Sequence, residues 1–211
     1  MGATTCFFVN SMASEAQELA RGLRRRDPEL LDRLIEQYHY RLFRYLMYVT
    51  GRRETAEDLF QETWIRVIER GHQYDAKWRF EAWLFSIARH LSIDLARRKS
   101  PLTGAEDLEE TGAMSGGQEA APSGRPMPVS PVELVASREE SERVAAALRG
   151  LSATHREVLL LRFQEDMALE EIAQVTGAPL STVKSRLYRG LEALRDRLEA
   201  RREGPLEGLK P

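Results

Sequence analysis

The clearest chemistry in this sequence lies near its end, where short hydroxyl side chains and cations share one face of a predicted helix. The members of this face are Ser181, Lys184, Ser185, Arg186 and Arg189. At 100° per residue the serines and Arg189 lie outward and the other two cations flank them. Hydroxyl and guanidinium groups can hydrogen-bond base edges, and flanking cations can bind phosphates. The face therefore predicts contact with duplex DNA, and an ordinary solvated basic face is the alternative.

Two short helices and a tight turn, over residues 169–189, must position this face. Ala173 is small where the two helices would cross, and Gly177 can take the positive φ that such a turn commonly needs. The inner side of the second helix is predicted to comprise Val183, Leu187, Gly190, Leu191 and Leu194. This spacing predicts a helix-turn-helix, whose second helix usually enters the major groove. Ala168 stands at the N-cap without a capping side chain, unless Asp166 compensates.

A second set of residues combines aromatics with cations on a predicted helix over residues 80–99. Trp83 and Phe85 are expected at the flanks of its apolar inner side. The outer side comprises Arg89, His90, Ile93 and Arg97. Aromatic faces stack bases while cations follow a phosphate backbone, which is the chemistry of single-stranded nucleic-acid binding. The alternative is that both aromatics pack against neighbouring helices.

A third candidate surface belongs to a helix predicted to begin at Thr55, with Asp58 three residues later in an arrangement like a capping box. Its core stripe is predicted to comprise Phe60, Trp64, Val67 and Ile68. The opposite face carries Asp58, Glu62, Arg66 and Glu69, with Gln61 at the boundary. Faces of this kind are most often solvated, so these residues alone do not establish a binding partner.

The rest of the sequence predicts an all-α protein of two small helical domains joined by a flexible linker. Further helices are expected over residues 15–26, 28–51, 132–149 and 152–164. The segment between the domains is rich in Gly, Pro, Ser, Ala and acids, and it has too few apolar residues to offset its ordering entropy. The predicted division is a tail over residues 1–14, a domain over 15–100, the linker over 101–131, a domain over 132–202 and a tail over 203–211.

Composition argues against several other classes of protein. The net charge is −2, so any case for nucleic-acid binding depends on local patches. The single cysteine, Cys6, excludes an internal disulfide, and the four histidines show no metal-ligand spacing. There is no glycine-rich phosphate loop, membrane span or signal peptide. We therefore expect a cytoplasmic protein with no catalytic residues, metal, cofactor or small-molecule substrate, which starts at either Met1 or Met12.

These features together make the sequence resemble the extracytoplasmic-function (ECF) sigma factors of bacterial RNA polymerase. The residues that carry the resemblance are 56–67, 80–89 with Asp94, Arg97 and Arg98, and 182–187. The resemblance implies that the first domain is sigma region 2 and the second is region 4. It implies core RNA polymerase and promoter DNA as partners, and commonly an anti-sigma factor, often membrane-bound. Polymerase contacts would be the clamp coiled coil for region 2 and the flap for region 4.

The resemblance also assigns roles to individual residues. Polymerase binding would fall to Asp58, Gln61, Glu62 and Arg66. The non-template strand of the −10 element, with a flipped base, would contact Trp78, Trp83, Arg89, His90, Arg97 and Arg98. The −35 duplex, about 70 Å away at two helical turns, would be read by Ser181, Lys184, Ser185, Arg186 and Arg189. His90, Ala168 and Ser181 depart from the residues usual at their positions.

Two other readings compete with this one. A free-standing helix-turn-helix regulator would explain the end of the chain but not the helices over residues 27–100. A helical adaptor with no DNA role would leave the basic faces without a function. Co-purification with core RNA polymerase and run-off transcription discriminate among the three.

Overall fold

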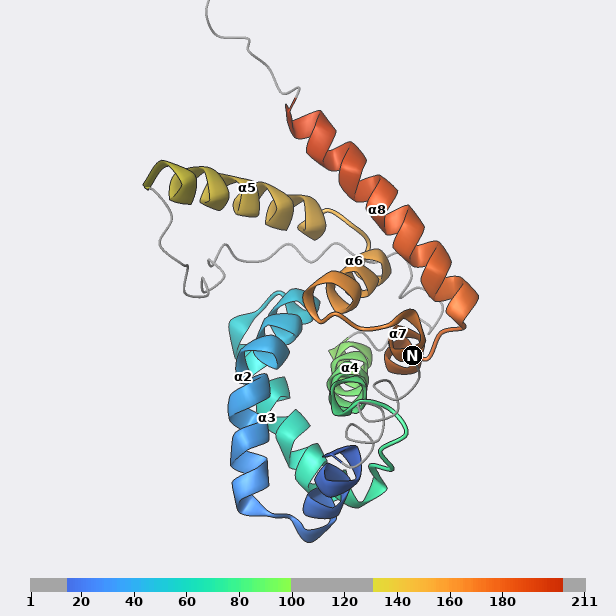
Figure 1. Cartoon of the computed structure of the whole chain (residues 1–211). Coiled ribbons are helices and arrows are strands. Elements are labelled where there is room, and N and C mark those ends of the chain that lie inside the picture. Colours follow the sequence, from blue (N-terminus) through green and yellow to red (C-terminus); the bar gives the residue numbers. More distant parts are fainter. Residues whose placement is uncertain (1–14, 100–130, 203–211) are drawn as a thin grey trace, which may run out of the picture.

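The computed structural model of the chain describes residues 15–99 and 131–202, and every regular element in those stretches is helical (Figure 1). The elements are a helix over residues 15–25, α2 (Pro28–Thr50), α3 (Arg53–Arg70), the 3₁₀ turn η1 (Gly71–Gln73), α4 (Phe80–Lys99), α5 (Pro131–Arg149), α6 (Ala153–Leu159), the π-helical segment η3 (Leu160–Gln164), α7 (Leu169–Thr176) and α8 (Leu180–Arg202). The predicted all-α class is confirmed. Both predicted tails, Met12 and nearly all of the predicted linker lie outside the described residues.

Helix α2 begins and ends where its sequence predicts. The Asp27 carboxylate caps it by accepting the backbone N–H groups of Glu29 at 3.1 Å and Leu30 at 3.4 Å. Pro28 occupies the first turn, where a missing N–H has no cost. Gly51 ends the helix with a left-handed φ of 66°, and its N–H bonds the Met47 carbonyl. This helix therefore enters the bundle with both ends fixed.

Helix α3 differs from the prediction at its start and along its buried side. It begins at Arg53, because Arg52 is extended (φ −134°), so Thr55 lies inside the first turn and the capping box predicted there is wrong. The buried stripe includes Leu59 and Thr63, whereas Ile68 is exposed. Burial of a threonine is tolerated here because its hydroxyl donates to the Leu59 carbonyl at 2.6 Å.

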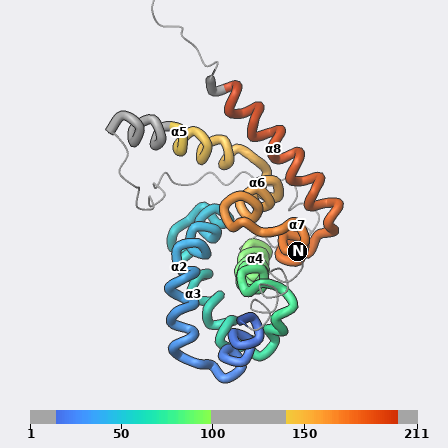
Figure 2. The backbone as a smooth tube through the Cα atoms, viewed as in Figure 1, coloured from blue at the N-terminus to red at the C-terminus, as the bar shows by residue number. Residues whose placement is uncertain are grey.

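In the second half of the chain, helix α8 packs along α6 and against α7 (Figure 2). The Ser152 hydroxyl caps α6 by accepting the His155 N–H, as predicted. Gly190 is buried where α8 faces α6, and a Cβ there would lie 3.4 Å from the Cβ of His155, at the edge of ordinary contact. The predicted helix over residues 152–164 changes after Leu159 into a π turn, in which Glu165 N–H bonds the Leu160 carbonyl.

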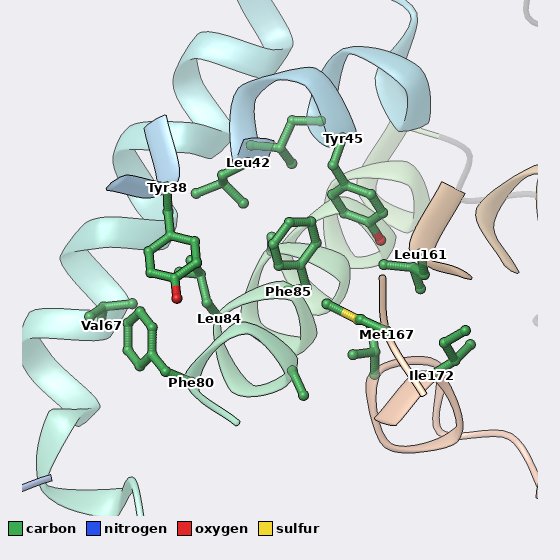
Figure 3. Close-up of a cluster of buried hydrophobic side chains, with 14 of the residues drawn as sticks. Tyr38, Leu42, Tyr45, Val67, Phe80, Leu84, Phe85, Leu161, Met167 and Ile172 are labelled. Atoms are coloured by element: carbon green, nitrogen blue, oxygen red, sulfur yellow. The ribbon is translucent and has the colours of Figure 1, made fainter. Parts of the chain in front are cut away.

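The two halves pack against each other through an apolar layer, which the sequence did not predict. Helix α7 lies on α4, and one continuous cluster of buried side chains crosses the boundary (Figure 3). From the first half it contains Tyr45 and Phe85, whose ring centroids are 5.1 Å apart. From the second half it contains Leu161, Met167 and Ile172, all almost fully buried. The segments that read as separate domains thus share one core.

Candidate nucleic-acid and protein-binding surfaces

The outer face of α8 has the arrangement that the sequence predicts. Ser181, Lys184, Ser185 and Arg189 are exposed and Arg186 is half-buried, while Val183 and Leu187 are buried on the inner side. Leu191 was predicted to lie on that inner side, but it is 37% exposed. The face therefore presents two hydroxyls beside several cations, as base and phosphate contacts require.

Tyr188 also belongs to this outer face, as helical periodicity predicts, although it was not among the residues expected to contact DNA. It is 69% exposed, although a tyrosine normally buries its ring. Its position, one residue before Arg189, places an aromatic ring among the hydroxyls and cations of the face. The signal available in the sequence was a large aromatic residue at a polar position of the helix.

The turn that orients this face is formed as the spacing predicts, but its cap is not the one suggested. Gly177 has φ 65°, the left-handed conformation expected of it. At Ala168, which has no side-chain acceptor, the Glu171 carboxylate accepts the backbone N–H at 2.8 Å. Asp166 is 97% exposed and pairs with Arg162 at 3.9 Å, so it does not compensate for the missing cap. Half of a capping box therefore holds the start of α7.

Completing this box should stabilise the helix-turn-helix. Ala168 has φ −65° and ψ 155°, the backbone that an N-cap serine adopts, and its side chain is exposed. We expect Ala168→Ser to raise the free energy of unfolding by about 0.5–1 kcal/mol. Urea unfolding followed by circular dichroism measures this. A stability equal to or below that of the parent chain would show that a serine hydroxyl adds no useful hydrogen bond to the backbone N–H groups at the start of α7.

His155 lies on α6, which packs against α8. Burial lowers its pKa, and the positive charges of Arg186 and Arg189 lower it further. The imidazole is therefore neutral in the folded chain over a pH range in which the unfolded chain binds a proton. Stability that depends on this group is present above the ordinary histidine pKa and is lost as pH falls.

This histidine should report on anions bound at α8. Duplex phosphates that neutralise Arg186 and Arg189 should raise the pKa of His155, as should Arg189→Ala. An NMR titration of the His155 ring protons with and without a DNA duplex carrying the −35 sequence gives both values. An unchanged pKa on saturation with duplex would place the DNA elsewhere.

A hollow between α3, η1 and α4 gathers residues from two of the predicted sites. Its volume is about 280 Å³, and its lining comprises Arg66, Arg70, Gln73, Trp83, Ser86, Ile87, His90, Leu91 and Asp94. Trp83 and His90 were predicted to lie on a nucleic-acid face, and Arg66 on a protein-binding face. His90 is held by its Nδ1, 2.6 Å from the Ser86 carbonyl. The hollow thus combines an aromatic wall with hydrogen-bonding groups and both signs of charge.

The aromatic residues of this region divide between surface and core. Trp83 is half-buried, with Tyr74 and Phe80 at 5.4 and 5.9 Å between ring centroids. Phe85, predicted at the flank, is instead fully buried against Tyr45, because α7 covers that side of α4. Tyr74 donates to the Trp78 carbonyl at 2.9 Å, and its burial, with Glu81 and Asp75 nearby, raises its pKa to about 12.

The remaining predicted −10 residues do not join the hollow. Trp78 lies on a smaller depression of about 40 Å³ that Gln174 of α7 also lines. Arg97 and Arg98 are exposed near the end of α4. Arg89 faces the second half of the chain, where its Nε donates to the Glu157 carboxylate at 2.9 Å. Trp83 thus lines the hollow with His90 and the smaller depression with Trp78, whereas Arg89, Arg97 and Arg98 line neither.

The exposed face of α3 carries the predicted protein-binding residues and an apolar component that the sequence reading missed. Asp58 and Gln61 are exposed, and half-buried Glu62 accepts Arg66 Nε at 2.9 Å. Ile65 is 47% exposed and lies one helical turn from Gln61 on the same face. A partner that docks on this face would bury the apolar surface of Ile65 together with the surrounding charged side chains.

Other kinds of site are not seen in the described stretches. Among residues 15–99 and 131–202, no three His, Cys, Asp or Glu side chains group as metal ligands. Within the same stretches no helix is both apolar and long enough to cross a membrane.

Comparison with known proteins identifies the family. Residues 34–101 match the family model for Sigma-70 region 2, and residues 141–194 match that for Sigma-70 region 4. The chain is 30% identical over 179 residues to the ECF RNA polymerase sigma factor SigX of Bacillus subtilis, covering 83% of this chain and 87% of SigX. It is also 30% identical over 174 residues to SigW of the same organism, covering 82% of this chain and 90% of SigW.

A solved structure shares the fold. The sigma factor RpoE of Bartonella quintana, in complex with the anti-sigma factor NepR, superposes with a TM-score of 0.60 at 20% identity, covering 80% of this chain and 96% of RpoE. Two region models in the expected order, together with relatives covered over most of their length, leave no place for a free-standing regulator. The chain belongs to the ECF sigma factors of RNA polymerase.

Proposed function

We propose that this ECF sigma factor binds core RNA polymerase through the exposed face of α3 and selects promoters with two DNA-reading surfaces, on α4 and α8. Residues 15–100 then form region 2 and residues 132–202 form region 4. The observation that carries the proposal is that three chemically distinct surfaces lie on separate helices of one chain. Promoter-directed initiation is the function of the family to which the chain belongs.

The α3 face is suited to a basic partner such as the clamp coiled coil. Asp58, Gln61 and Glu62 supply carboxylates and an amide, and Ile65 adds apolar area that would be buried on docking. Arg66 holds Glu62 in place at 2.9 Å, and it reaches Glu69 at 3.5 Å. We assign Arg66 a positioning role at this surface, because it pairs with both carboxylates.

The hollow beside α4 is suited to a base flipped out of the −10 strand. Trp83 offers an aromatic wall, and Gln73, His90 and Asp94 offer donors and acceptors for a base edge. Arg97 and Arg98 continue the surface as phosphate contacts. Arg89 and Trp78 would join it only when region 4 moves away, since both now face residues of the second half.

The α8 face is suited to the −35 duplex in the major groove. Ser185 and Arg189 are the proposed base-reading residues, and Lys184 and Arg186 the flanking phosphate contacts. Ser181, at the start of the helix, also faces the groove. Tyr188 joins them through its exposed ring, which can pack on a thymine methyl group.

The proposed partners are core RNA polymerase, promoter DNA and an anti-sigma factor. The complex of RpoE with NepR is an example of a sigma factor bound to an anti-sigma factor. We place the chain in the cytoplasm, where polymerase and promoters are found. The proposal assigns no catalytic step, cofactor or small-molecule substrate to it.

Reconstituted transcription tests the proposal directly. Core polymerase lacking sigma is mixed with the chain and a genomic fragment library, and transcript starts are mapped. We expect starts that share two upstream elements and depend on the added chain. Failure to bind core, together with promoter binding by the chain alone, would support the regulator reading instead.

A further inference from the structure

Ion pairs join the two halves of the chain across their shared boundary. The second half contributes carboxylates, Glu157, Glu165 and Glu171, and the first half contributes guanidiniums, Arg41, Arg44, Arg79 and Arg89. We call these seven residues the interdomain cluster. All of its cross-boundary ion pairs run in the same direction, with acids on region 4 and bases on region 2.

Glu165 is the centre of the interdomain cluster. Its side chain is only 1% exposed, and it accepts Arg41 Nε at 2.7 Å and Arg44 Nη2 at 3.1 Å. Arg41 also donates to the Glu165 main-chain carbonyl at 3.2 Å. A carboxylate buried this far from water is stable only with both cations in place, so separating the halves returns it to solvent.

The backbone around Glu165 is specialised for this contact. Glu165 is the C-cap of η3, and the next residue, Asp166, has a left-handed φ of 50°. Such a conformation is uncommon for a residue other than glycine. The consequence is that adjacent acids point in opposite directions, Glu165 into the boundary and Asp166 into solvent.

Glu157 makes the second contact, and its partner is a proposed DNA-binding residue. One oxygen, Oε1, accepts the Tyr45 hydroxyl at 2.8 Å and Arg89 Nε at 2.9 Å. A carboxylate thus occupies the guanidinium that a phosphate of the −10 strand would bind. Burial and this carboxylate also raise the pKa of Tyr45, which keeps its hydroxyl a donor.

The packed arrangement of the two halves is also too compact for simultaneous binding to both promoter elements. Helix α7, the first helix of the helix-turn-helix, lies directly on α4, so region 4 is held against region 2 in this arrangement. Promoter elements two duplex turns apart are separated by about 70 Å. The halves must therefore part before one chain can occupy both elements.

We propose that the packed arrangement is a closed, autoinhibited state of the free chain, held by the interdomain cluster, in which region 4 carboxylates stand in for the phosphates of the −10 strand. Closure and strand binding compete for Arg89, so each weakens the other by the same factor. This inference rests on the proposed role of α4 in strand binding. Its distinctive consequence is that Glu165, which contacts no DNA in the proposal, controls DNA affinity.

The test compares two neighbouring acids. Nitroxide labels are attached at Glu36→Cys on α2 and Asp196→Cys on α8, both exposed positions, in a Cys6→Ser background of the full chain. Glu165→Gln removes the buried charge, and Asp166→Asn removes a charge from the adjacent exposed residue. Pulsed electron resonance then gives the distance distribution between the halves.

For Glu165→Gln we expect the ratio of open to closed chain to rise at least about tenfold, and for Asp166→Asn we expect no change. The affinity of Glu165→Gln for a labelled single strand carrying the mapped −10 sequence should rise by a similar factor while the closed state dominates. Adding that strand to the parent chain should also lengthen the measured distance.

A second variant, with its substitution in the other half of the chain, shows whether opening results from loss of the ion pair or from local unfolding around η3. Arg44→Gln removes the partner of Glu165 from the other half and should open the chain in the same way. Identical distances in all variants, or opening without a gain in strand affinity, would overturn the inference. Transcription with core polymerase is measured in a separate assay. A parent chain that directs transcription but shows only open distances would refute the closed state and leave the proposed function intact.

Discussion

Replacing Glu62 with lysine should abolish binding to core RNA polymerase and leave the fold intact. Glu62 lies in the middle of the α3 face and is half-buried, so its reversal affects the interface and not the core. A lysine there also sits one turn from Arg66, which turns an attractive pair into a repulsive one. Placing like charges together across an interface costs several kcal/mol, so affinity should fall at least about a hundredfold.

The matched control is Glu57→Lys. Glu57 forms an i, i+4 pair with Arg53 on the same helix at 2.8 Å, close to the 2.9 Å of the Glu62 pair, and it lies at the edge of the face, about 140° around α3 from Glu62. The Glu57→Lys variant therefore loses an intrahelical ion pair and reverses one charge, as Glu62→Lys does. Fluorescence anisotropy with purified core measures both variants. Equal losses would mean that net charge or helix stability, and not the α3 face, determines binding.

Arg189→Ala should retain polymerase binding and reduce transcription from promoters that depend on the −35 element. Arg189 is exposed on the outer face of α8, so its removal leaves no buried group without a partner. A guanidinium that binds a base edge contributes about 1–3 kcal/mol of discrimination, so promoter use should fall about tenfold to a hundredfold. The loss should disappear on a template whose −35 element is scrambled.

Arg195→Ala is the control for this variant. Arg195 is exposed on the same helix and pairs only with Asp196 and Glu199 in the described part of the chain, beyond the proposed groove face. It removes an equal charge from α8 at a greater distance from the turn. If both alanine variants lower transcription alike and reduce its salt dependence equally, Arg189 would be a general phosphate contact and not a reader of bases.

Most of the fold could be predicted because local patterns determine it. Asp27, Gly51, Ser152 and Gly177 each have a local backbone or capping role that is visible without tertiary contacts. The errors arise where a neighbouring helix decides the outcome. Phe85 is buried because α7 covers it, and such contacts over long sequence separations leave no periodic signal.

The candidate surfaces were predictable to different degrees. The α8 face follows from one amphipathic helix, so its residues appear where periodicity places them. The hollow beside α4 needs residues from three elements, and only the structure brings Gln73 and Asp94 next to Trp83. The pairing of Arg89 with Glu157, 68 residues along the chain, was out of reach for the same reason.

The one-directional charge pattern between the halves has a consequence for protein engineering. Regions 2 and 4 match separate family models, so each can be exchanged as a unit in a chimeric sigma factor. Here, a transplanted region 4 would control background activity only if it brought carboxylates equivalent to Glu157 and Glu165 to the guanidiniums of region 2. If the proposed closed state holds, chimeras without these two acids should stay open, and introducing the acids should restore closure.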